Sequence, residues 1–204
     1  MLELILGTVF LIYILFIGQL IYGCNRMKRF SRKEFTPKTP FTIVVPFRNE
    51  KENLPNLLHS ISLLNYPKEL VEIILVDDDS EEVFSVQDLV FSLKVIKNDR
   101  KSNSPKKDAI ETAIQVAKND WIITTDADCL IQKDWLTTFD QYIQENEVEM
   151  VASGVCYVPK NSFLSAFQNL DFLSLQGATI GSFGINQPFM CNGANFAYSK
   201  QFFK

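Results

Sequence analysis

The sequence is poor in the residue types from which several common kinds of site are built. Histidine occurs once, as His59, on a predicted helix where it serves packing or the surface. The cysteines are widely spaced, without the rhythm of metal ligands, and at this chain length they favour reduced thiols over a disulfide framework (Cys24, Cys129, Cys156 and Cys191). A formal net charge of −4 leaves no basic stripe, so we expect no nucleic-acid partner.

A glycine-rich phosphate loop is also missing from the place where a nucleotidyltransferase needs one. The first predicted strand, 41–46, is followed by Phe47-Arg48-Asn49-Glu50, which contains no glycine. Because such a loop holds phosphates with closely approaching backbone amides, its absence argues against a nucleotidyltransferase built on a similar sheet.

Charged residues are absent between Leu4 and Asn25. A helix of that length spans the roughly 30 Å hydrocarbon layer of a bilayer, and the segment lacks the basic start and cleavage site of a signal peptide. Glu3 alone precedes it, whereas a basic cluster follows it (Arg26, Lys28, Arg29, Arg32 and Lys33). The positive-inside rule places the amino terminus outside and the rest of the chain in the cytoplasm. We predict an anchor at 1–25 in the cell's inner (plasma) membrane, a basic juxtamembrane linker at 26–40, and a domain at 41–204.

The domain alternates short apolar runs with segments of helical periodicity, which predicts a parallel sheet built from βαβ units. The strands are expected at 41–46, 71–76, 93–97 and 121–125, and the helices at 51–64, 105–117 and 133–145. Right-handed crossovers put the carboxyl ends of such strands at one edge of the sheet. Three polar clusters, 47–50, 77–80 and 126–128, are therefore expected to converge in one cleft.

Two carboxylates follow the strand at 121–125 directly. Asp126 and Asp128 are two residues apart, so in extended backbone they face the same side. Hard oxygen donors at the carboxyl end of a buried strand suit Mg2+ or Mn2+ better than Zn2+. The alternative interpretation is that the pair merely ends the strand and caps the next helix.

Five motifs resemble, in their order, those of family 2 glycosyltransferases with the GT-A fold. The resemblance covers about 41–204 and implies an α/β, Rossmann-like, mainly parallel sheet flanked by helices, here preceded by one transmembrane helix. It is carried by Val44-Val-Pro46-Phe-Arg48-Asn49-Glu50, Val76-Asp77-Asp78-Asp79-Ser80, Lys106-Lys107-Asp-Ala109-Ile110, Thr125-Asp126-Ala-Asp128 and Cys191-Asn192-Gly193-Ala194-Asn195-Phe-Ala-Tyr198.

The family's site residues carry over onto these motifs. The resemblance implies that the loop Pro46, Arg48, Asn49 and Glu50 and the acids Asp77 and Asp78 hold the donor nucleotide, usually uridine, with Asp78 on the base and Asp77 supporting it. Lys106 matches the basic residue near the diphosphate. Asp126 and Asp128 match the DxD motif that binds Mg2+ or Mn2+, with Asp126 also able to contact the ribose. For Asp77–Asp79 the alternative is a turn with side-chain hydrogen bonds to the backbone.

The last part of the chain resembles the acceptor side. Asn192 and Gly193 border the acceptor site by resemblance; otherwise they form a tight turn. We expect a pair of strands within 148–158 and an amphipathic helix at 163–177, whose apolar residues are assigned to the core. The alternative is that they rest against the membrane surface. Gly181, Gly184 and Gly193 are expected to mark a flexible segment.

The resemblance thus predicts an inverting hexosyl- or N-acetylhexosaminyltransferase that uses a nucleotide-sugar, expected to be UDP-linked. The acceptor is a glycan or lipid-linked molecule of cell-envelope polysaccharide or glycolipid synthesis. The family's catalytic base lies beyond the Asn-Gly-Ala-Asn segment, so we expect it beyond Lys204. The alternative is a partner subunit that binds nucleotide-sugar but lacks the base.

Overall fold

The computed structural model describes residues 1–31, 33–82 and 91–203, so Arg32 of the predicted basic cluster lies outside the described residues. The chain forms two compact units. One comprises Met1–Ser31 and Gly154–Asn192, and the other Arg32–Ser153 and Gly193–Lys204. This division by compactness differs from the domain boundaries expected at 25 and 40, which remain a prediction.

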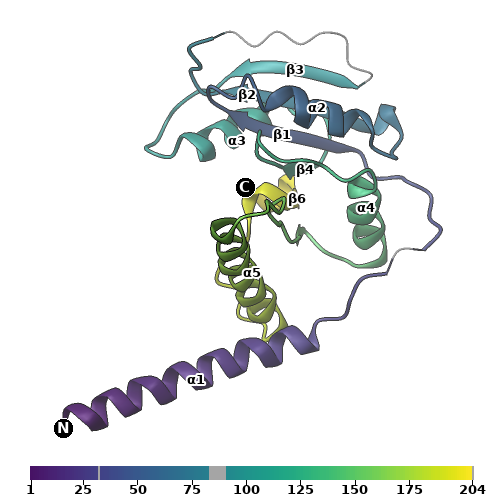
Figure 1. Cartoon of the computed structure of the whole chain (residues 1–204). Helices are drawn as coiled ribbons and strands as arrows, with labels where there is room; N and C mark the ends of the chain where they lie inside the picture. Colours follow the sequence, from purple (N-terminus) through teal and green to yellow (C-terminus); the bar gives the residue numbers. More distant parts are fainter. Residues whose placement is uncertain (32, 83–90, 204) are drawn as a thin grey trace. The chain divides into compact units, whose positions relative to one another are not determined.

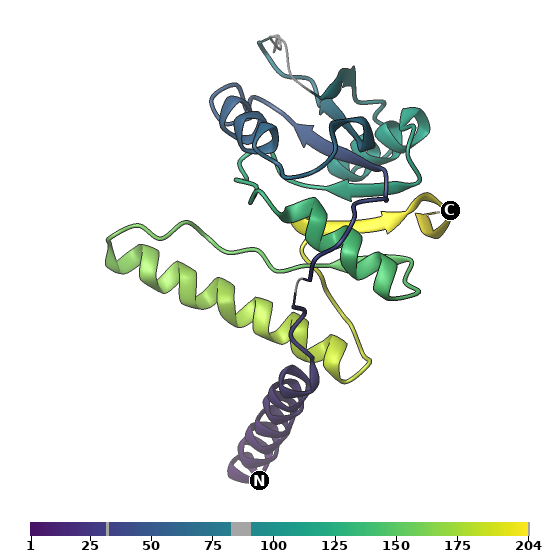
Figure 2. The same ribbon diagram turned by 90° about the vertical axis from the view of Figure 1, so that its right-hand side faces the viewer.

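The second unit is built on a six-stranded sheet with the order β3-β2-β1-β4-β6-β5. Its strands are β1 (Phe41–Phe47), β2 (Val71–Asp77), β3 (Ser92–Lys97), β4 (Trp121–Thr124), β5 (Met150–Ala152) and β6 (Phe196–Ser199). The first four are parallel, as predicted, whereas β6 pairs antiparallel with both β4 and β5. Figure 2 shows β6, in yellow, running beside β4.

The prediction of a strand pair within 148–158 is wrong. Only the three residues of β5 form a strand within 148–158, and β6 was not predicted. The alternation of Phe196, Ala197, Tyr198 and Ser199 is too short to distinguish a strand from the neighbouring apolar residues. Pairing with the central strand β4 is what makes this segment extended.

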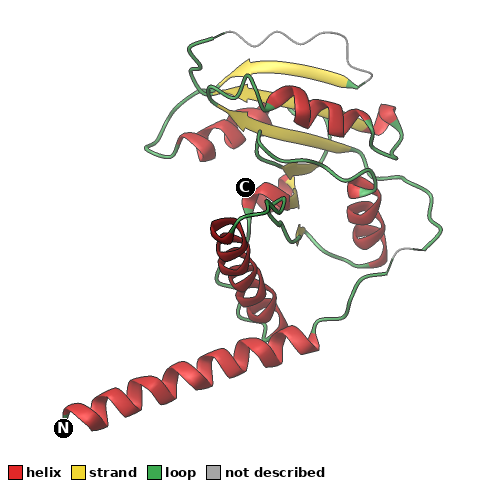
Figure 3. Cartoon of the chain, in the orientation of Figure 1, coloured by secondary structure: helices red, strands yellow, loops and turns green. Residues whose placement is uncertain are grey.

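Helices cover both faces of the sheet (Figures 1 and 3). On one face, α2 (Leu54–Ser62) and α4 (Trp135–Glu145) enclose a core with the inward residues of β1 and β2, such as Ile43 and Ile73. On the other face, α3 (Pro105–Val116) packs its alanines on Val44 and Ile74. The remaining short elements are η1 (Lys68–Leu70), η2 (Gly193–Asn195) and α6 (Lys200–Phe203). The helices expected at 51–64, 105–117 and 133–145 are all present, but α2 begins at Leu54 rather than at 51, with a proline in its first turn.

The register sets the ends of the parallel strands. Phe47 at the end of β1 pairs with Asp77 at the end of β2, and Thr124 at the end of β4 pairs with Val44 of β1. The loops after these three strands therefore leave the same edge of the sheet, which is the arrangement that the crossover rule predicts.

The first unit consists of two long helices, α1 (Leu2–Arg26) and α5 (Phe163–Gly184), which cross near their carboxyl ends (Figure 1). By length and composition, α1 can cross a membrane. The expected flexible segment is wrong for Gly181 and Gly184, because both lie inside α5 and touch the backbone of α1. The core assignment for Phe163 and its neighbours is also wrong, since Phe163 is 89% exposed.

Candidate functional site

The two carboxylates after β4 lie at the carboxyl edge of the sheet. Asp126 is half-buried and Asp128 is exposed, with the buried Ala127 between them. The strand that carries them is anchored on both sides: the Thr125 amide donates to the Val44 carbonyl at 3.2 Å, and the Thr124 hydroxyl donates to the Gly193 carbonyl at 2.6 Å. The fold thus holds the start of the Asp126–Asp128 turn in a fixed position.

Lys106 reaches this turn from another element. It lies in the first turn of α3, and its ammonium group donates to Asp126 Oδ1 at 2.5 Å. Both side chains remain partly exposed, so the pair contributes little to stability. Two of the residues that the motifs singled out for the diphosphate and its metal are therefore brought into contact, twenty positions apart in the sequence.

The carboxylate oxygens of this turn are the type of ligand that a hard divalent cation prefers. Asp126 and Asp128 supply carboxylate oxygens, and among the described residues no group of three or more His, Cys, Asp or Glu side chains could hold a metal ion. Mg2+ is commonly bound in this way, by one or two carboxylates with the remaining positions filled by water and substrate phosphates. The pair is therefore suited to a cation that arrives together with a phosphorylated ligand.

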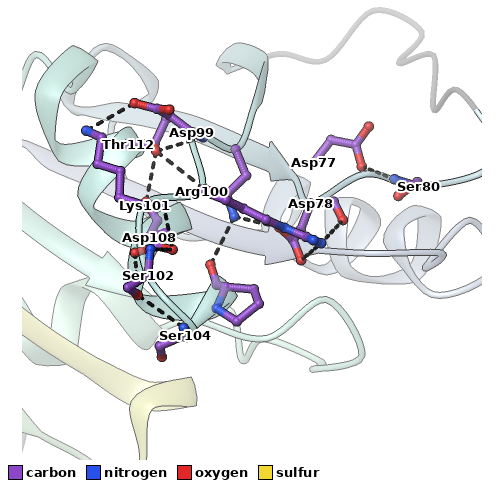
Figure 4. Close-up of polar contacts among 12 residues, drawn as sticks. Asp77, Asp78, Ser80, Asp99, Arg100, Lys101, Ser102, Ser104, Asp108 and Thr112 are labelled. Atoms are coloured by element: carbon purple, nitrogen blue, oxygen red, sulfur yellow. Dashed lines mark hydrogen bonds and ion pairs between the residues drawn. The ribbon is translucent and has the colours of Figure 1, made fainter.

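Asp78 forms the second charged centre at the same edge of the sheet (Figure 4). Its Oδ1 accepts hydrogen bonds from Arg100 Nε at 2.7 Å and Asn98 Nδ2 at 2.6 Å, and its Oδ2 accepts one from Arg100 Nη2 at 2.8 Å. The side chain is almost buried. The Arg100 guanidinium lowers the pKa of Asp78 below its ordinary value, against the opposing effect of burial, with Asn98 and, more weakly, Arg48 adding to the decrease.

A second acid holds the loop from which Arg100 extends. Asp108, buried in the first turn of α3, accepts hydrogen bonds from the backbone amides of Lys101 and Ser102 at 3.0 and 2.8 Å and from the Ser102 hydroxyl at 2.8 Å (Figure 4). The hydrogen bond from the Ser102 backbone amide is the largest of the effects that lower the pKa of Asp108. A carboxylate with this many donors fixes the loop and so positions Arg100.

Asp77 makes the turn hydrogen bond described as the alternative for this acidic run, and its supporting role beside a nucleotide stays a prediction. Its Oδ1 accepts from the Ser80 amide at 2.9 Å, which closes a turn in which Asp79 has a left-handed φ of 67°. Such a turn projects the neighbouring Asp78 toward Arg100.

The loop after β1 is bound to the loop after β2. Asn49, at a left-handed φ of 56°, donates its amide to the Ser80 hydroxyl at 3.0 Å and accepts from the Glu81 amide at 2.9 Å. Glu50 accepts from Asn53 at the start of α2. A cavity of about 360 Å3 opens between these loops, lined by residues of both, including Phe47 and Glu82. Of the three polar clusters expected to converge in one cleft, 47–50 lines this cavity with Phe47, Asn49 and Glu50, and 77–80 lines it with Ser80 alone. Asp77, Asp78 and the cluster 126–128 lie outside it.

The other residues predicted for the site lie in the loop after β1 and in the segment 192–195. Pro46 is half-buried within β1 and Arg48 is exposed beyond it.

Gly193 begins η2, and its carbonyl accepts the hydrogen bond of the Thr124 hydroxyl. This segment therefore lies beside β4, the strand that precedes the two aspartates. Asn192 precedes it in the chain. Asn195 accepts from Trp135 Nε1 at 2.8 Å, which ties the segment to α4.

Sequence reasoning missed Arg100 and Asn98. Both lie in the polar stretch after β3, where no periodicity distinguishes one polar residue from another. The available signal was physical: an acid at a strand end that is buried by the fold needs a donor partner, and Arg100 follows the neighbouring strand in the sheet.

Comparison with known proteins adds the following. Residues 42–204 match the family model described as glycosyl transferase family 2. Poly-beta-1,6-N-acetyl-D-glucosamine synthase of Staphylococcus aureus is 24% identical over 171 residues, which are 81% of this chain and 40% of that protein. The chain therefore spans well under half the length of this relative.

Two solved structures have a similar fold. A mannosyltransferase from Pyrobaculum calidifontis, in complex with GDP-Man and Mn2+, is 18% identical with a TM-score of 0.59, covering 91% of this chain and 53% of that one. Glucosyl-3-phosphoglycerate synthase from Mycobacterium tuberculosis, in complex with Mn2+, UDP and glucosyl-3-phosphoglycerate, is 15% identical with a TM-score of 0.56, covering 85% and 64%. At these identities the likeness concerns the fold, and it confirms the predicted GT-A architecture.

Proposed function

The chain belongs to glycosyl transferase family 2, and from that premise we propose that it transfers a sugar from a nucleoside diphosphate donor, with inversion, to a glycan or lipid-linked acceptor. The observation that carries this proposal is the contact of Lys106 with Asp126 beside Asp128, at the sheet edge that also bears Asp78. Positive and negative groups for a diphosphate and its cation are thus assembled where open α/β sheets bind ligands.

The proposed chemistry breaks the bond between the anomeric carbon and the diphosphate oxygen. The acceptor hydroxyl forms the new bond as it loses its proton, and the electron pair of the broken bond leaves with the nucleoside diphosphate. Lys106 provides positive charge near the leaving group. A divalent cation, Mg2+ or Mn2+, would be held by Asp126 and Asp128 and would supply charge stabilisation for the same group. A general base must take the proton of the acceptor hydroxyl as the new bond forms.

The pair of Asp78 and Arg100 supports a particular kind of nucleobase. A carboxylate offers about four acceptor positions, and three on Asp78 are used by Asn98 and Arg100. The remaining position on Oδ2 lies beside a guanidinium with N–H donors to spare. An acceptor next to a donor complements the N–H and carbonyl edge of uracil or guanine. A carboxylate placed to accept the ring N–H would instead face the lone pair of the cytosine ring nitrogen, which is an acceptor. We therefore propose a UDP-sugar, with a GDP-sugar as the competing donor.

The product and the setting are proposed from what the chain resembles and from α1. The relative named as a poly-N-acetylglucosamine synthase supports a hexose or N-acetylhexosamine donor and a cell-envelope polysaccharide or glycolipid product. Helix α1 supports anchoring in the inner membrane with the second unit in the cytoplasm, because the basic residues Arg26, Lys28 and Arg29 follow its apolar run.

Calorimetric titration of the whole chain in nanodiscs with UDP, GDP and CDP in the presence of Mn2+ tests the donor site. UDP or GDP should bind and CDP should bind more weakly, since the three share a diphosphate and differ in the base. Removal of Mn2+, or Asp128→Ala, should weaken UDP binding about ten-fold or more.

The matched control is Asp120→Ala, which removes an exposed acid at the opposite end of the same strand and should leave binding unchanged. Binding of UDP that ignores both Mn2+ and Asp128 would overturn the metal assignment. Equal binding of UDP and CDP would overturn the base assignment and leave the diphosphate site standing.

A further inference from the structure

The loop 98–104 between β3 and α3 has no apolar anchor of its own. Residues 99–104 are all exposed, and none of them belongs to a helix or a strand. Arg100, in the middle of this loop, nevertheless donates two hydrogen bonds to the Asp78 carboxylate. Because a loop without buried apolar side chains keeps one conformation only through its polar contacts, the position of Arg100 depends on what its loop is bonded to.

Asp108 makes the largest share of these contacts. Its buried side chain lies in the first turn of α3. Oδ2 accepts from the backbone amides of Lys101 and Ser102, the two residues directly after Arg100, and Oδ1 accepts from the Ser102 hydroxyl. An acidic side chain near a helix amino terminus can bind that helix's own free amide groups. The two backbone amides on Asp108 come from the preceding loop instead.

Thr112 fixes the loop on the other side of Arg100 (Figure 4). It lies one helical turn after Asp108, and its hydroxyl accepts from the Asp99 amide at 3.2 Å. The same hydroxyl donates to the Asp108 carbonyl at 2.8 Å, so its orientation is set by α3. The residues that flank Arg100 are therefore both bonded to this helix.

Asn98 joins the acid assigned to the base to the helix itself. Its Nδ2 donates to Asp78 Oδ1 at 2.6 Å and to the carbonyl of Pro105, the first residue of α3, at 3.0 Å. The next residue of the helix is Lys106, whose ammonium group contacts Asp126. Helix α3 is therefore the common support of the groups assigned to the base and to the diphosphate.

We propose that Asp108 is a positioning residue for recognition of the nucleobase, because it docks the loop 98–104 on α3 and so holds Arg100 against Asp78. The inference rests on the donor function proposed above, and it adds a residue that acts through Arg100 rather than on the donor. Lys106 is placed by the helix and not by the loop. Loss of Asp108 should therefore change the choice of base more than the binding of the diphosphate.

The test is calorimetric titration of the whole chain in nanodiscs with UDP and with CDP, both in the presence of Mn2+. Asp108→Ala should weaken UDP binding about ten-fold, because the guanidinium beside the base is no longer held in place. CDP binding should weaken by less than about two-fold. A loss of folded protein would lower the stoichiometry of both ligands equally, so the ratio of the two dissociation constants reports the positioning alone.

Two milder variants test the same docking and do not depend on whether Asp108→Ala folds. In Asp108→Asn, the amide oxygen can accept from both loop amides, which share Oδ2 in the wild type, and the amide nitrogen can donate to the Ser102 hydroxyl. UDP affinity should stay within about three-fold of the wild type. Thr112→Val removes the acceptor of the Asp99 amide and should weaken UDP binding about three-fold, with CDP binding unchanged.

The matched control is Glu72→Ala, which removes another buried carboxylate of the same unit. Glu72 also accepts three hydrogen bonds, from Thr42, Lys94 and the Lys118 amide. It lies near the start of β2, at the opposite end of the strand that leads to Asp78. Glu72→Ala should destabilise the unit and leave the ratio of UDP to CDP affinity unchanged.

Hydrogen exchange separates docking of the loop from recognition of the base. The amides of Lys101 and Ser102 should exchange faster in Asp108→Ala than in the wild type. Faster exchange with an unchanged ratio of UDP to CDP affinity would overturn the proposal, and so would equal weakening of both nucleotides. Equal binding of UDP and CDP by the wild type would instead overturn the base assignment of the proposed function, on which this inference rests.

Discussion

The acidic residues of the site differ in burial and in hydrogen-bond partners. Asp128 is exposed and Asp126 half-buried, with Lys106 as the partner of Asp126. Asp78, in contrast, is nearly buried and bound by Arg100 and Asn98. Because a buried carboxylate without donors is costly, the Asp78 pair serves the fold as well as the proposed base contact. Function and stability are therefore separable at Asp128 and joined at Asp78.

Arg100→Gln should destabilise the second unit. The change leaves Asp78 almost buried with Asn98 as its remaining donor, so the free energy of unfolding should fall by about 1–3 kcal/mol. Urea unfolding monitored by the fluorescence of Trp121 and Trp135, which both lie in this unit, measures the change. Lys101→Gln is the matched control, because the neighbouring cation pairs with the exposed Asp99 and should matter by less than about 1 kcal/mol.

The same pair sets a pH dependence with a definite sign. Arg100 lowers the pKa of Asp78 in the folded state. The stabilisation is therefore present above the ordinary aspartate pKa and is lost as the pH falls through the lowered one. The stability difference between the wild type and Arg100→Gln should be full at neutral pH and shrink in acid. A difference that grew as the pH fell would contradict this assignment.

At the residue scale, the sequence predicted where the acidic residues lie in the fold better than it predicted which side chains they contact. Asp78, Asp126 and Asp128 were found because each follows a recognisable buried strand, and strand ends can be read locally. Their contacts with Arg100 and Lys106 join segments about twenty residues apart through the sheet order. A local sequence pattern does not show which of two such distant segments will be brought into contact. Asn49 was assigned to the nucleotide, whereas its hydrogen bonds with Ser80 and Glu81 hold the loop after β2; its role toward a ligand stays a prediction.

At the scale of elements, the predicted linker is bound to α4 through a buried carboxylate. Asp140 accepts hydrogen bonds from the backbone amides of Lys38 and Thr39 and from three side chains: the Thr39 hydroxyl, the Tyr66 hydroxyl at 2.7 Å and Gln144 Nε2 at 2.8 Å. Burial raises the pKa of Asp140, but these donors outweigh it and the net pKa is lowered. The segment before β1 is thus ordered by one acid on α4 rather than by its own sequence.

Asp140→Asn should lower the free energy of unfolding by about 2 kcal/mol, because an amide offers fewer acceptor positions and places N–H groups against existing donors. Tyr66→Phe, which removes one donor and keeps the carboxylate, should cost about half as much. Urea titrations at neutral pH give both values. Since the folded pKa of Asp140 is lowered, the cost of Asp140→Asn should diminish as the pH falls below the ordinary aspartate range, and a pH-independent cost would contradict this account.

The crossing of α1 and α5 offers a comparison of two glycines in one helix. Gly181→Ala places a methyl group against the backbone of Leu20, whereas a Cβ at Gly177 meets nothing within 4 Å. Gly181→Ala should therefore separate the helices and speed hydrogen exchange at the end of α5. Gly177→Ala should leave exchange unchanged or slower, since alanine favours helix by about 1 kcal/mol over glycine. Equal exchange in the two variants would show that the close crossing is not formed.

Elements were predictable where the sequence carried a continuous or periodic apolar pattern. The strands β1 and β2 are continuous apolar runs, the helices α3 and α4 carry apolar residues at helical spacing, and all four were found. Glycines in α5 were misread as flexible because glycine signals a break in isolation. Their actual role is to allow two backbones to approach, which depends on a partner helix some 150 residues away in the chain.

At the scale of the whole molecule, the donor site and the two long helices belong to different compact units. The residues assigned to the nucleotide and the metal, Pro46 to Asp128, lie in the second unit, and the crossing of α1 and α5 lies in the first. Substitutions at distant, independent sites have additive effects, and we expect this for changes in separate compact units. Gly181→Ala should therefore loosen α5 while the dissociation constant for UDP, measured by calorimetry in nanodiscs, stays within about two-fold of the wild type.

Asp128→Ala, measured in the same nanodiscs, shows that the assay detects a lost donor site, and Gly177→Ala controls for a substitution in α5 that makes no collision. Unchanged UDP affinity in Gly181→Ala, together with faster exchange in α5, would establish that donor binding belongs to the second unit alone. A weaker affinity in Gly181→Ala but not in Gly177→Ala would instead show that the packing of the first unit reaches the nucleotide site. Membrane attachment would then regulate donor binding as well as location, and the separation argued here would be wrong.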